Sequence, residues 1–156
     1  MQARAKGLPL AMLATATHDH KRGEDVRARL AVLSELGDEW SHAVKLWLRL
    51  AAPRLRQVDG IRMPHEGDLA ILFQTIVGTW PHGLATNDEP GLATYAARLT
   101  AWQQKALREA KLWSDWSEPN EVYESAATDF IQSLFAEPSD LLNEIAAFTH
   151  RIAAAG

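Results

Sequence analysis

The sequence predicts a mainly α-helical protein, with about six helices packed as a bundle-like domain. Apolar residues recur at helical spacing through almost the whole chain from about residue 25 onward. The stretches between these segments are short and polar, and several carry helix-start signals, such as Asp38-Glu39 and Pro138-Ser139-Asp140. The 156 residues, of which 47% are hydrophobic and 23% charged, suffice for one domain with a sizeable core.

Six segments carry this helical pattern in order along the chain. Their apolar positions are Val26, Leu30 and Leu33; Trp40, Ala43, Val44, Trp47 and Ala51; Leu69, Leu72, Phe73, Ile76, Val77 and Trp80; Leu92, Tyr95, Ala96, Leu99, Trp102 and Ala106; Tyr123, Ala127, Phe130 and Leu134; and Leu142, Ile145, Ala146, Thr149 and Ile152. Pro81 ends the third segment. The fourth is expected from about Pro90 to Trp113, and the fifth is expected to open at Ser117-Glu118-Pro119. Four of the tryptophans lie on these stripes and are expected in the core.

The segment Leu10–Thr17 departs from the helical pattern. It is apolar, short and followed by a polar cluster, which is typical of a buried parallel strand. Nothing else in the sequence is read as a second strand, so this strand lacks a partner for its backbone groups. We therefore expect the chain to be part of a larger, sheet-containing protein. The alternative is a short secretory signal, since Arg4 and Lys6 precede the apolar run and Ala14-Thr15-Ala16 resembles a cleavage site.

Charge and composition exclude several classes of function. The net charge of -4 gives no basic face for sequence-independent binding of nucleic acid, so no nucleic-acid partner is expected. The chain has no cysteine, which excludes disulfides and thiolate metal sites and favours a cytoplasmic location. No apolar run approaches the roughly 20 residues that span a bilayer, so no membrane association is expected.

The candidate site directly follows the expected strand. His18 and Asp19 are adjacent there, and Lys21, Arg22 and Asp25 come within the next six residues. In barrel enzymes the catalytic groups lie at the C-terminal ends of strands, on the loops that lead into the next helix. An aspartate beside a hydrogen-bonding histidine can bind sugar hydroxyls or stabilise a cationic transition state.

Simpler interpretations of the same residues remain. Taken alone, the His18-Asp19 pair is typical of a loop that caps a helix. The i, i+2 spacing of His18 and His20 hints at a metal site, but no second ligand cluster is evident, and we expect neither metal nor cofactor. Glu24 is interpreted as a first-turn acid that complements a helix dipole, whereas Asp25 fits a cap and a pocket equally well. Arg27 and Arg29 are interpreted as a solvated or ion-paired face.

Five blocks of sequence resemble maltooligosyl trehalose synthases, which belong to the α-amylase superfamily. The blocks are Ala14–Arg29 (ATATHDHKRGEDVRAR); its continuation to Leu36, so that 26–36 read VRARLAVLSEL; Leu72–Thr75 with Gly78–Pro81; Lys105–Lys111; and Pro119–Glu121 with Tyr123-Glu124. They occur in the order found in that family and cover most of the chain. The sequence departs from the family pattern at His20, where a small hydroxyl residue is usual, and at Gly23, where serine is more usual.

The resemblance implies a fold and a reaction. Residues 1–25 would form the end of a (β/α)8 catalytic barrel, namely its seventh strand and the following loop, and residues 26–156 a helical domain. The family converts the reducing-end α-1,4 linkage of a maltooligosaccharide into an α,α-1,1 linkage, a step of trehalose biosynthesis. Asp19 matches the third catalytic carboxylate, and His18 its partner in binding sugar hydroxyls. Lys21, Arg22 and Asp25 are expected to bind substrate, with the two cations on the acceptor side.

The remaining carboxylates of this mechanism are not expected in the chain. The nucleophile and the acid/base belong to earlier barrel strands and would lie upstream of Met1, so the isolated chain is expected to be inactive. We also expect some self-association through surfaces that the missing barrel would cover.

Two other functions fit the sequence less well. A stand-alone helical carbohydrate-binding or interaction module would have little use for the lone strand and the His-Asp loop. A related hydrolase of the same superfamily would lack the long helical insertion. Trp113 and Trp116 are the better candidates for stacking against sugar, and no role is assigned to Lys105 and Lys111.

Overall fold

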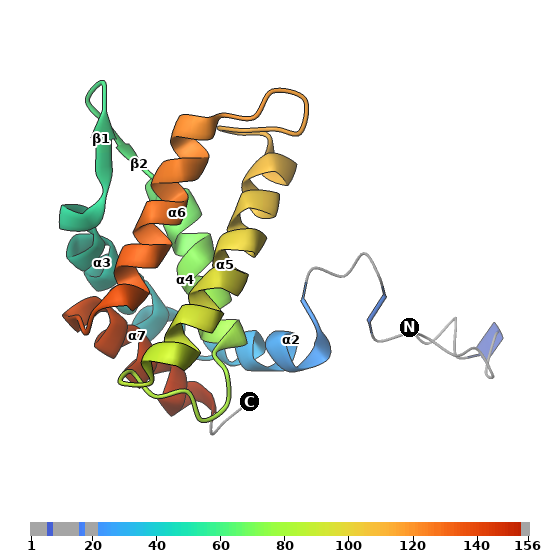
Figure 1. The fold of residues 1–156 in the computed structure, drawn as a ribbon. Coiled ribbons are helices and arrows are strands. Elements are labelled where there is room, and N and C mark those ends of the chain that lie inside the picture. The colour runs from blue at the N-terminus through green and yellow to red at the C-terminus, as the bar shows by residue number, and fades with distance from the viewer. Residues whose placement is uncertain (1–5, 8–15, 18–21, 154–156) are drawn as a thin grey trace.

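The computed structural model describes residues 6–7, 16–17 and 22–153, and over these residues it confirms the mainly α-helical fold (Figure 1). Six α-helices follow one another in the described part: α2 (Glu24–Ala31), α3 (Gly37–Ala51), α4 (Glu66–Thr79), α5 (Glu89–Ala110), α6 (Glu121–Ala136) and α7 (Asp140–Ala153). Short 3-10 turns, Val32–Ser34 and Ala52–Arg54, extend α2 and α3. The expected strand at Leu10–Thr17 lies, apart from its last two residues, outside the described residues.

A small β-hairpin between α3 and α4 was not predicted, since no segment other than Leu10–Thr17 was interpreted as a strand. Strand β1 (Arg56–Val58) pairs antiparallel with β2 (Ile61–Met63), and Val58 lies opposite Ile61. The two residues between them, Asp59 and Gly60, both have positive φ, 51° and 81°. Asp-Gly is a preferred pair for a two-residue hairpin turn of this kind. The dipeptide was the available signal for this hairpin.

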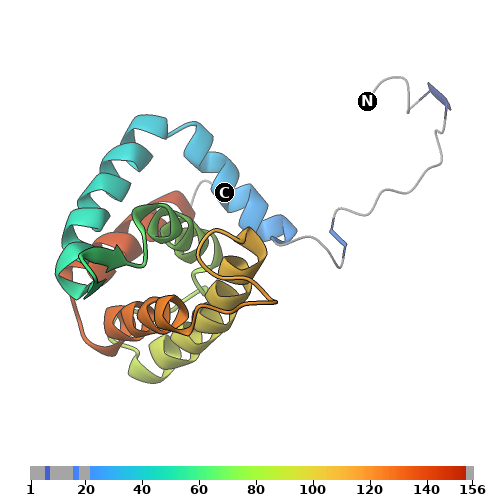
Figure 2. The same cartoon turned by 90° about the horizontal axis from the view of Figure 1, so that it is seen from above.

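Helix α4 lies at the centre of the bundle and contacts α2, α3, α5 and α7 (Figure 2). Its buried residues face several directions, which is typical of a helix surrounded by others. They are Asp68, Leu69, Leu72, Phe73, Thr75, Ile76, Val77 and Gly78. Helices α5 and α6 pack along each other and cover one side of α4, whereas α3 and α7 cover another.

Aromatic side chains fill the core between these layers. The ring of Trp47 meets those of Phe73 and Phe148 edge to face at 5.6 and 5.5 Å between centroids. Trp80 contacts Tyr95 in the same manner, at 5.8 Å. Trp47 and Trp80 are buried, as predicted. The other two tryptophans of the predicted stripes, Trp40 and Trp102, are only half-buried and pack against the core from its edge.

Side-chain caps fix where several helices begin. Asp88 accepts a hydrogen bond from the Gly91 amide, 3.1 Å, at the start of α5. Helix α6 begins at Glu121, because Asn120 accepts from the Tyr123 amide at 3.0 Å. The predicted opening of this helix at Ser117-Glu118-Pro119 is therefore too early, and Ser117 instead bonds to a neighbouring side chain.

Helix α2 is held against the C-terminal half of α4 by a glycine and an arginine. A Cβ atom placed on Gly78 would lie 2.9 Å from Val26 Cγ1 and 3.1 Å from Leu30 Cγ, closer than packed carbon atoms approach. Arg29 donates to the carbonyl oxygens of Trp80, 3.0 Å, and Val77, 3.5 Å, at the electronegative end of α4. Arg29, which the sequence placed on a solvated or ion-paired face, is thus half-buried and anchors α2 to α4.

Replacing Gly78 with alanine is expected to lower the free energy of unfolding by about 1–2 kcal/mol, since overpacking outweighs the gain in helix propensity. Urea unfolding measures this change, and hydrogen exchange of the α2 amides should accelerate because the clash falls on α2. Gly67→Ala, in the same helix, is the control: its nearest neighbour is 3.9 Å away, and this variant should be as stable as the parent or more so. Equal stability of the two variants would contradict the close-packing argument.

Candidate functional site

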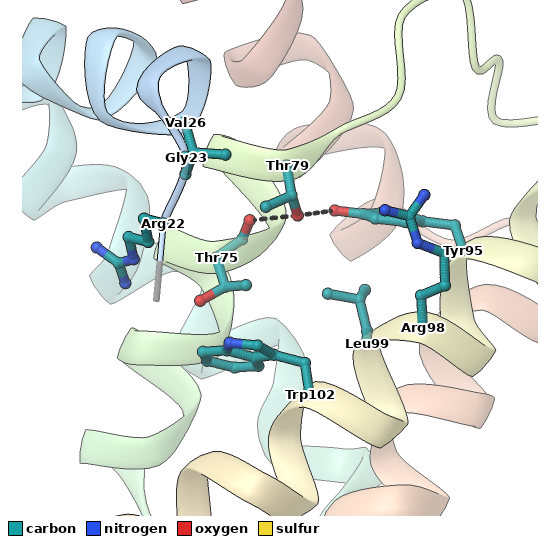
Figure 3. A pocket seen from close by; sticks show the side chains of 9 residues that line it. All are labelled: Arg22, Gly23, Val26, Thr75, Thr79, Tyr95, Arg98, Leu99 and Trp102. Carbon is teal, nitrogen blue, oxygen red and sulfur yellow. Dashed lines mark hydrogen bonds between the residues drawn. The ribbon is translucent and has the colours of Figure 1, made fainter. Parts of the chain in front are cut away.

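A small pocket lies where the start of α2 meets α4 and α5 (Figure 3). Its volume is about 160 Å³, and its lining residues are Arg22, Gly23, Val26, Thr75, Thr79, Tyr95, Arg98, Leu99 and Trp102. Helix α2 begins at Glu24, so the backbone that enters this helix forms one edge of the pocket. The candidate His-Asp segment immediately precedes this edge in the sequence.

The polar wall of the pocket is a chain of hydroxyl groups on α4 and α5. Thr79 Oγ1 donates to the carbonyl oxygen of Thr75 at 2.7 Å and lies 2.8 Å from the Tyr95 hydroxyl (Figure 3). The Tyr95 hydroxyl in turn donates to the Ile76 carbonyl oxygen at 3.1 Å. Burial raises the pKa of Tyr95 to about 12. The phenol therefore stays protonated at neutral pH, and its proton is donated to the backbone of α4.

The other groups on the pocket wall are two cationic side chains and an apolar surface. Arg22 and Arg98 come from different segments, and guanidinium groups donate several hydrogen bonds in a fixed plane. The half-buried indole of Trp102 and the side chain of Leu99 supply apolar surface. Sites for drug-sized ligands usually measure about 300–1,000 Å³. A pocket of about 160 Å³ could accept one end of a ligand, such as a single sugar ring, but not a whole oligosaccharide.

The structure describes two of the five site residues predicted from the sequence. Arg22 lines the pocket. Asp25 is exposed in the first turn of α2 and is not among the pocket residues; the N-cap of this helix is Gly23, and no side chain caps it. His18, Asp19 and Lys21 lie outside the described residues.

Sequence reasoning missed most of the pocket. Thr75 and Thr79 interrupt the apolar stripe of α4 four residues apart, and Tyr95, Arg98 and Trp102 follow at i, i+3 and i+7 on α5. Each set shares a helix face, so a polar strip could have been read from the spacing. The two strips face each other because of the way α4 packs against α5. This packing cannot be predicted from a local sequence pattern.

A second polar cluster lies where α5 ends and α6 begins. The buried carboxylate of Glu124 accepts two hydrogen bonds from Arg108, both 2.8 Å, one from Gln104 at 3.1 Å and one from Ser114 at 2.5 Å. These donors, chiefly Arg108, lower the pKa of Glu124 to about 2. All four bonds come from the protein itself, so we assign the cluster a structural role.

Neither a metal centre nor a membrane segment is found in the described ranges. No group of three or more His, Cys, Asp or Glu side chains in those ranges could hold a metal ion. Every helix in the same ranges is too short or too polar to cross a bilayer.

Comparison with known proteins gives a consistent result at two levels. Over 121 residues, 78% of this chain, the sequence is 34% identical to a protein assigned as a maltooligosyl trehalose synthase in two strains of Mycobacterium tuberculosis. The hypothetical maltooligosyl trehalose synthase of Sulfolobus tokodaii matches with a TM-score of 0.74 and 35% identity over 92% of this chain. The maltooligosyltrehalose synthase of Arthrobacter ramosus matches with a TM-score of 0.75 and 27% identity over 99% of it. No family model matches.

These matches cover only a small part of each relative. The aligned part is 14% of the M. tuberculosis protein, 18% of the S. tokodaii chain and 17% of the A. ramosus chain. The chain is thus a fragment-sized homologue of one helical region within a class of much longer enzymes. Those enzymes are the maltooligosyl trehalose synthases, and the homology extends from sequence to fold.

Proposed function

We propose that this chain supplies the His18-Asp19 loop and its helical support to a maltooligosyl trehalose synthase, whose remaining catalytic groups lie outside the chain. In this proposal residues 1–25 are the end of a catalytic barrel and residues 26–156 a helical domain. The substrate is a maltooligosaccharide in the cytoplasm, and the product carries an α,α-1,1 linkage at its former reducing end.

The observation that carries the proposal is homology of both sequence and fold to a region of these enzymes. The pocket supports it as well, because the segment that leads out of the candidate loop forms one of its edges. The proposed domain boundary at 25/26 falls inside α2, which begins at Glu24. Helix α2 would therefore connect the two domains. Its packing on α4 would help to fix the position of the loop that precedes it.

Each proposed site residue has a separate task in this mechanism. Asp19 stabilises the positive charge that develops on the sugar at the cleaved linkage, and His18 binds its hydroxyls. Lys21 and Arg22 hold the released glucose so that its anomeric oxygen attacks instead of water. Asp25 is also predicted to bind substrate, but it lies in the first turn of α2 and does not line the pocket.

The decisive experiment is product analysis with maltopentaose as substrate. The chain alone should leave the sugar unchanged, because a retaining mechanism needs a nucleophile and an acid/base about 5–5.5 Å apart. Replacing the matching region of the S. tokodaii relative with this chain, or adding the upstream barrel portion in trans, should give a non-reducing product. Loss of reducing ends measures isomerisation, and free glucose measures hydrolysis.

Two outcomes would contradict the proposal. Conversion of maltopentaose by the isolated chain would show that its own carboxylates suffice. A chimaera that folds and binds maltopentaose but forms no non-reducing product would show that this loop does not serve the synthase reaction. The chimaera also tests Lys21 and Arg22, whose replacement by alanine should raise the ratio of hydrolysis to isomerisation.

A further inference from the structure

Most of the large apolar side chains that are exposed in the described part of the chain lie close together in the sequence. Six such residues exist there, and four lie where α5 passes into α6: Leu112, Trp113, Trp116 and Val122, with 75%, 40%, 57% and 50% of their surface exposed. The other two, Ile61 and Ile71, belong to the hairpin and to α4. We call residues 111–120 the tryptophan loop; it lies at the same end of the bundle as the hairpin (Figure 1).

Hydrogen bonds within the tryptophan loop fix its shape. The carboxylate of Asp115 accepts from the amide and hydroxyl of Ser117, both 2.7 Å, and from the amide of Glu118 at 2.8 Å. Ser114 accepts from the Asn120 amide at 3.0 Å and donates to Glu124. The loop is therefore ordered before any ligand binds, which reduces the entropic cost of binding.

Both indole rings of the loop are backed by fixed groups. Trp113 lies nearly parallel to the ring of Tyr123, with centroids 5.5 Å apart and an angle of 13°, and its ring also contacts that of His65 at 5.6 Å between centroids. The Tyr123 hydroxyl accepts from the His65 amide and donates to Asp68, so this ring cannot rotate freely. The guanidinium of Arg108 lies 5.1 Å from the centroid of the Trp116 ring and is held in turn by Glu124. Rigid, half-exposed aromatic rings are suited to stacking.

We propose that the tryptophan loop is a binding surface for an α-1,4-linked glucan, separate from the pocket beside α2. The apolar C–H face of a glucose ring would lie on an indole, and its hydroxyls would reach the polar rim formed by exposed Lys111, Glu118 and Asn120. The identity of the sugar rests on the proposed function, whereas the surface itself does not. Thirteen residues of helical rise separate Arg98 in the pocket from Lys111, a distance of about 20 Å.

A protein partner fits this surface less well. Cores of protein interfaces are depleted in charged residues, and a stable interface buries about 800 Å² on each side. In the tryptophan loop the two indoles are interleaved with charged and polar side chains, including Asp115 and Glu118 between and beside them. A glucan, whose rings each have an apolar face and a polar edge, matches this alternation.

The test is a titration of the full chain with maltoheptaose. Binding is measured by isothermal titration calorimetry and by tryptophan fluorescence. Trp116→Ala and Trp113→Ala should each weaken binding by about 3- to 10-fold. Ile71→Ala removes an equally exposed apolar side chain elsewhere on the surface and should bind like the parent. Circular dichroism confirms that each variant is folded.

Three results would overturn the proposal. One is no binding of maltoheptaose to the parent chain up to its solubility limit. Another is a loss of binding in Arg98→Ala with none in Trp116→Ala, which would place the sugar in the pocket and leave the proposed function intact. A third is protection of the loop from solvent when the upstream barrel portion is added without sugar, which would show a protein surface covering it. Failure of the proposed function would give a different result: the chimaera would be inactive, whereas maltoheptaose would still bind normally at the tryptophan loop.

Discussion

Replacing Asp19 with asparagine in the chimaeric synthase is expected to lower the rate of isomerisation by about 10³-fold. In the proposed mechanism this carboxylate stabilises the cationic, oxocarbenium-like transition state, and removal of one preorganised electrostatic group commonly reduces turnover by about 10²–10³-fold. Asparagine keeps the size of the side chain and removes its charge. The loss should therefore appear mainly in kcat, because the charge it stabilises develops only in the transition state.

The measurement is formation of non-reducing product from maltopentaose under saturating substrate. Asp38→Asn, which neutralises an exposed aspartate in the first turn of α3, is the matched control and should keep the parent rate. A rate within a factor of about 10 of the parent in Asp19→Asn would remove Asp19 from the catalytic machinery. A change confined to KM would instead make it a ground-state binding residue.

The sequence predicted the helices because each of them carries its own evidence. The apolar stripe from Leu69 to Trp80 and its end at Pro81 are local signals, and α4 indeed runs to Thr79. The hairpin was missed although Asp59-Gly60 is a strong turn signal, since strands of three residues are too short to show an alternating pattern. The start of α6 was misplaced because Ser117 and Asn120 are both good caps, and only the fold shows which one is used.

The candidate site, too, could be predicted only in part from the sequence. Arg22 was singled out from its neighbours in sequence, and the structure places it at the pocket. Tyr95, Arg98 and Trp102 were assigned to a core stripe or not noticed, because their shared role depends on how α5 packs against α4. Arg29 was interpreted as part of a solvated or ion-paired face for the same reason: its partners, the carbonyl groups of Val77 and Trp80, are 48 and 51 residues away.

Replacing Glu124 with glutamine is expected to lower the free energy of unfolding at pH 7 by about 2–3 kcal/mol. The change removes a buried charge that accepts four hydrogen bonds and leaves the Arg108 guanidinium without its counter-ion. It should also loosen the tryptophan loop, because Ser114 bonds to the same carboxylate. Equilibrium unfolding in urea, with intrinsic tryptophan fluorescence as the probe, measures the loss. Glu121→Gln, an exposed residue in the first turn of the same helix, should cost only a few tenths of a kcal/mol.

The pH dependence of this difference identifies its cause. Because the pKa of Glu124 in the folded state is lowered from 4.5 to about 2, the stabilisation is fully present above about pH 4.5 and is lost as the pH falls toward 2. The gap in stability between the parent and Glu124→Gln should therefore narrow between pH 4.5 and pH 2, whereas the small gap for Glu121→Gln should not follow the same course. A gap that stays constant over this range would mean that the cost of the substitution is steric, and that the ion pair with Arg108 adds nothing to the stability of the fold.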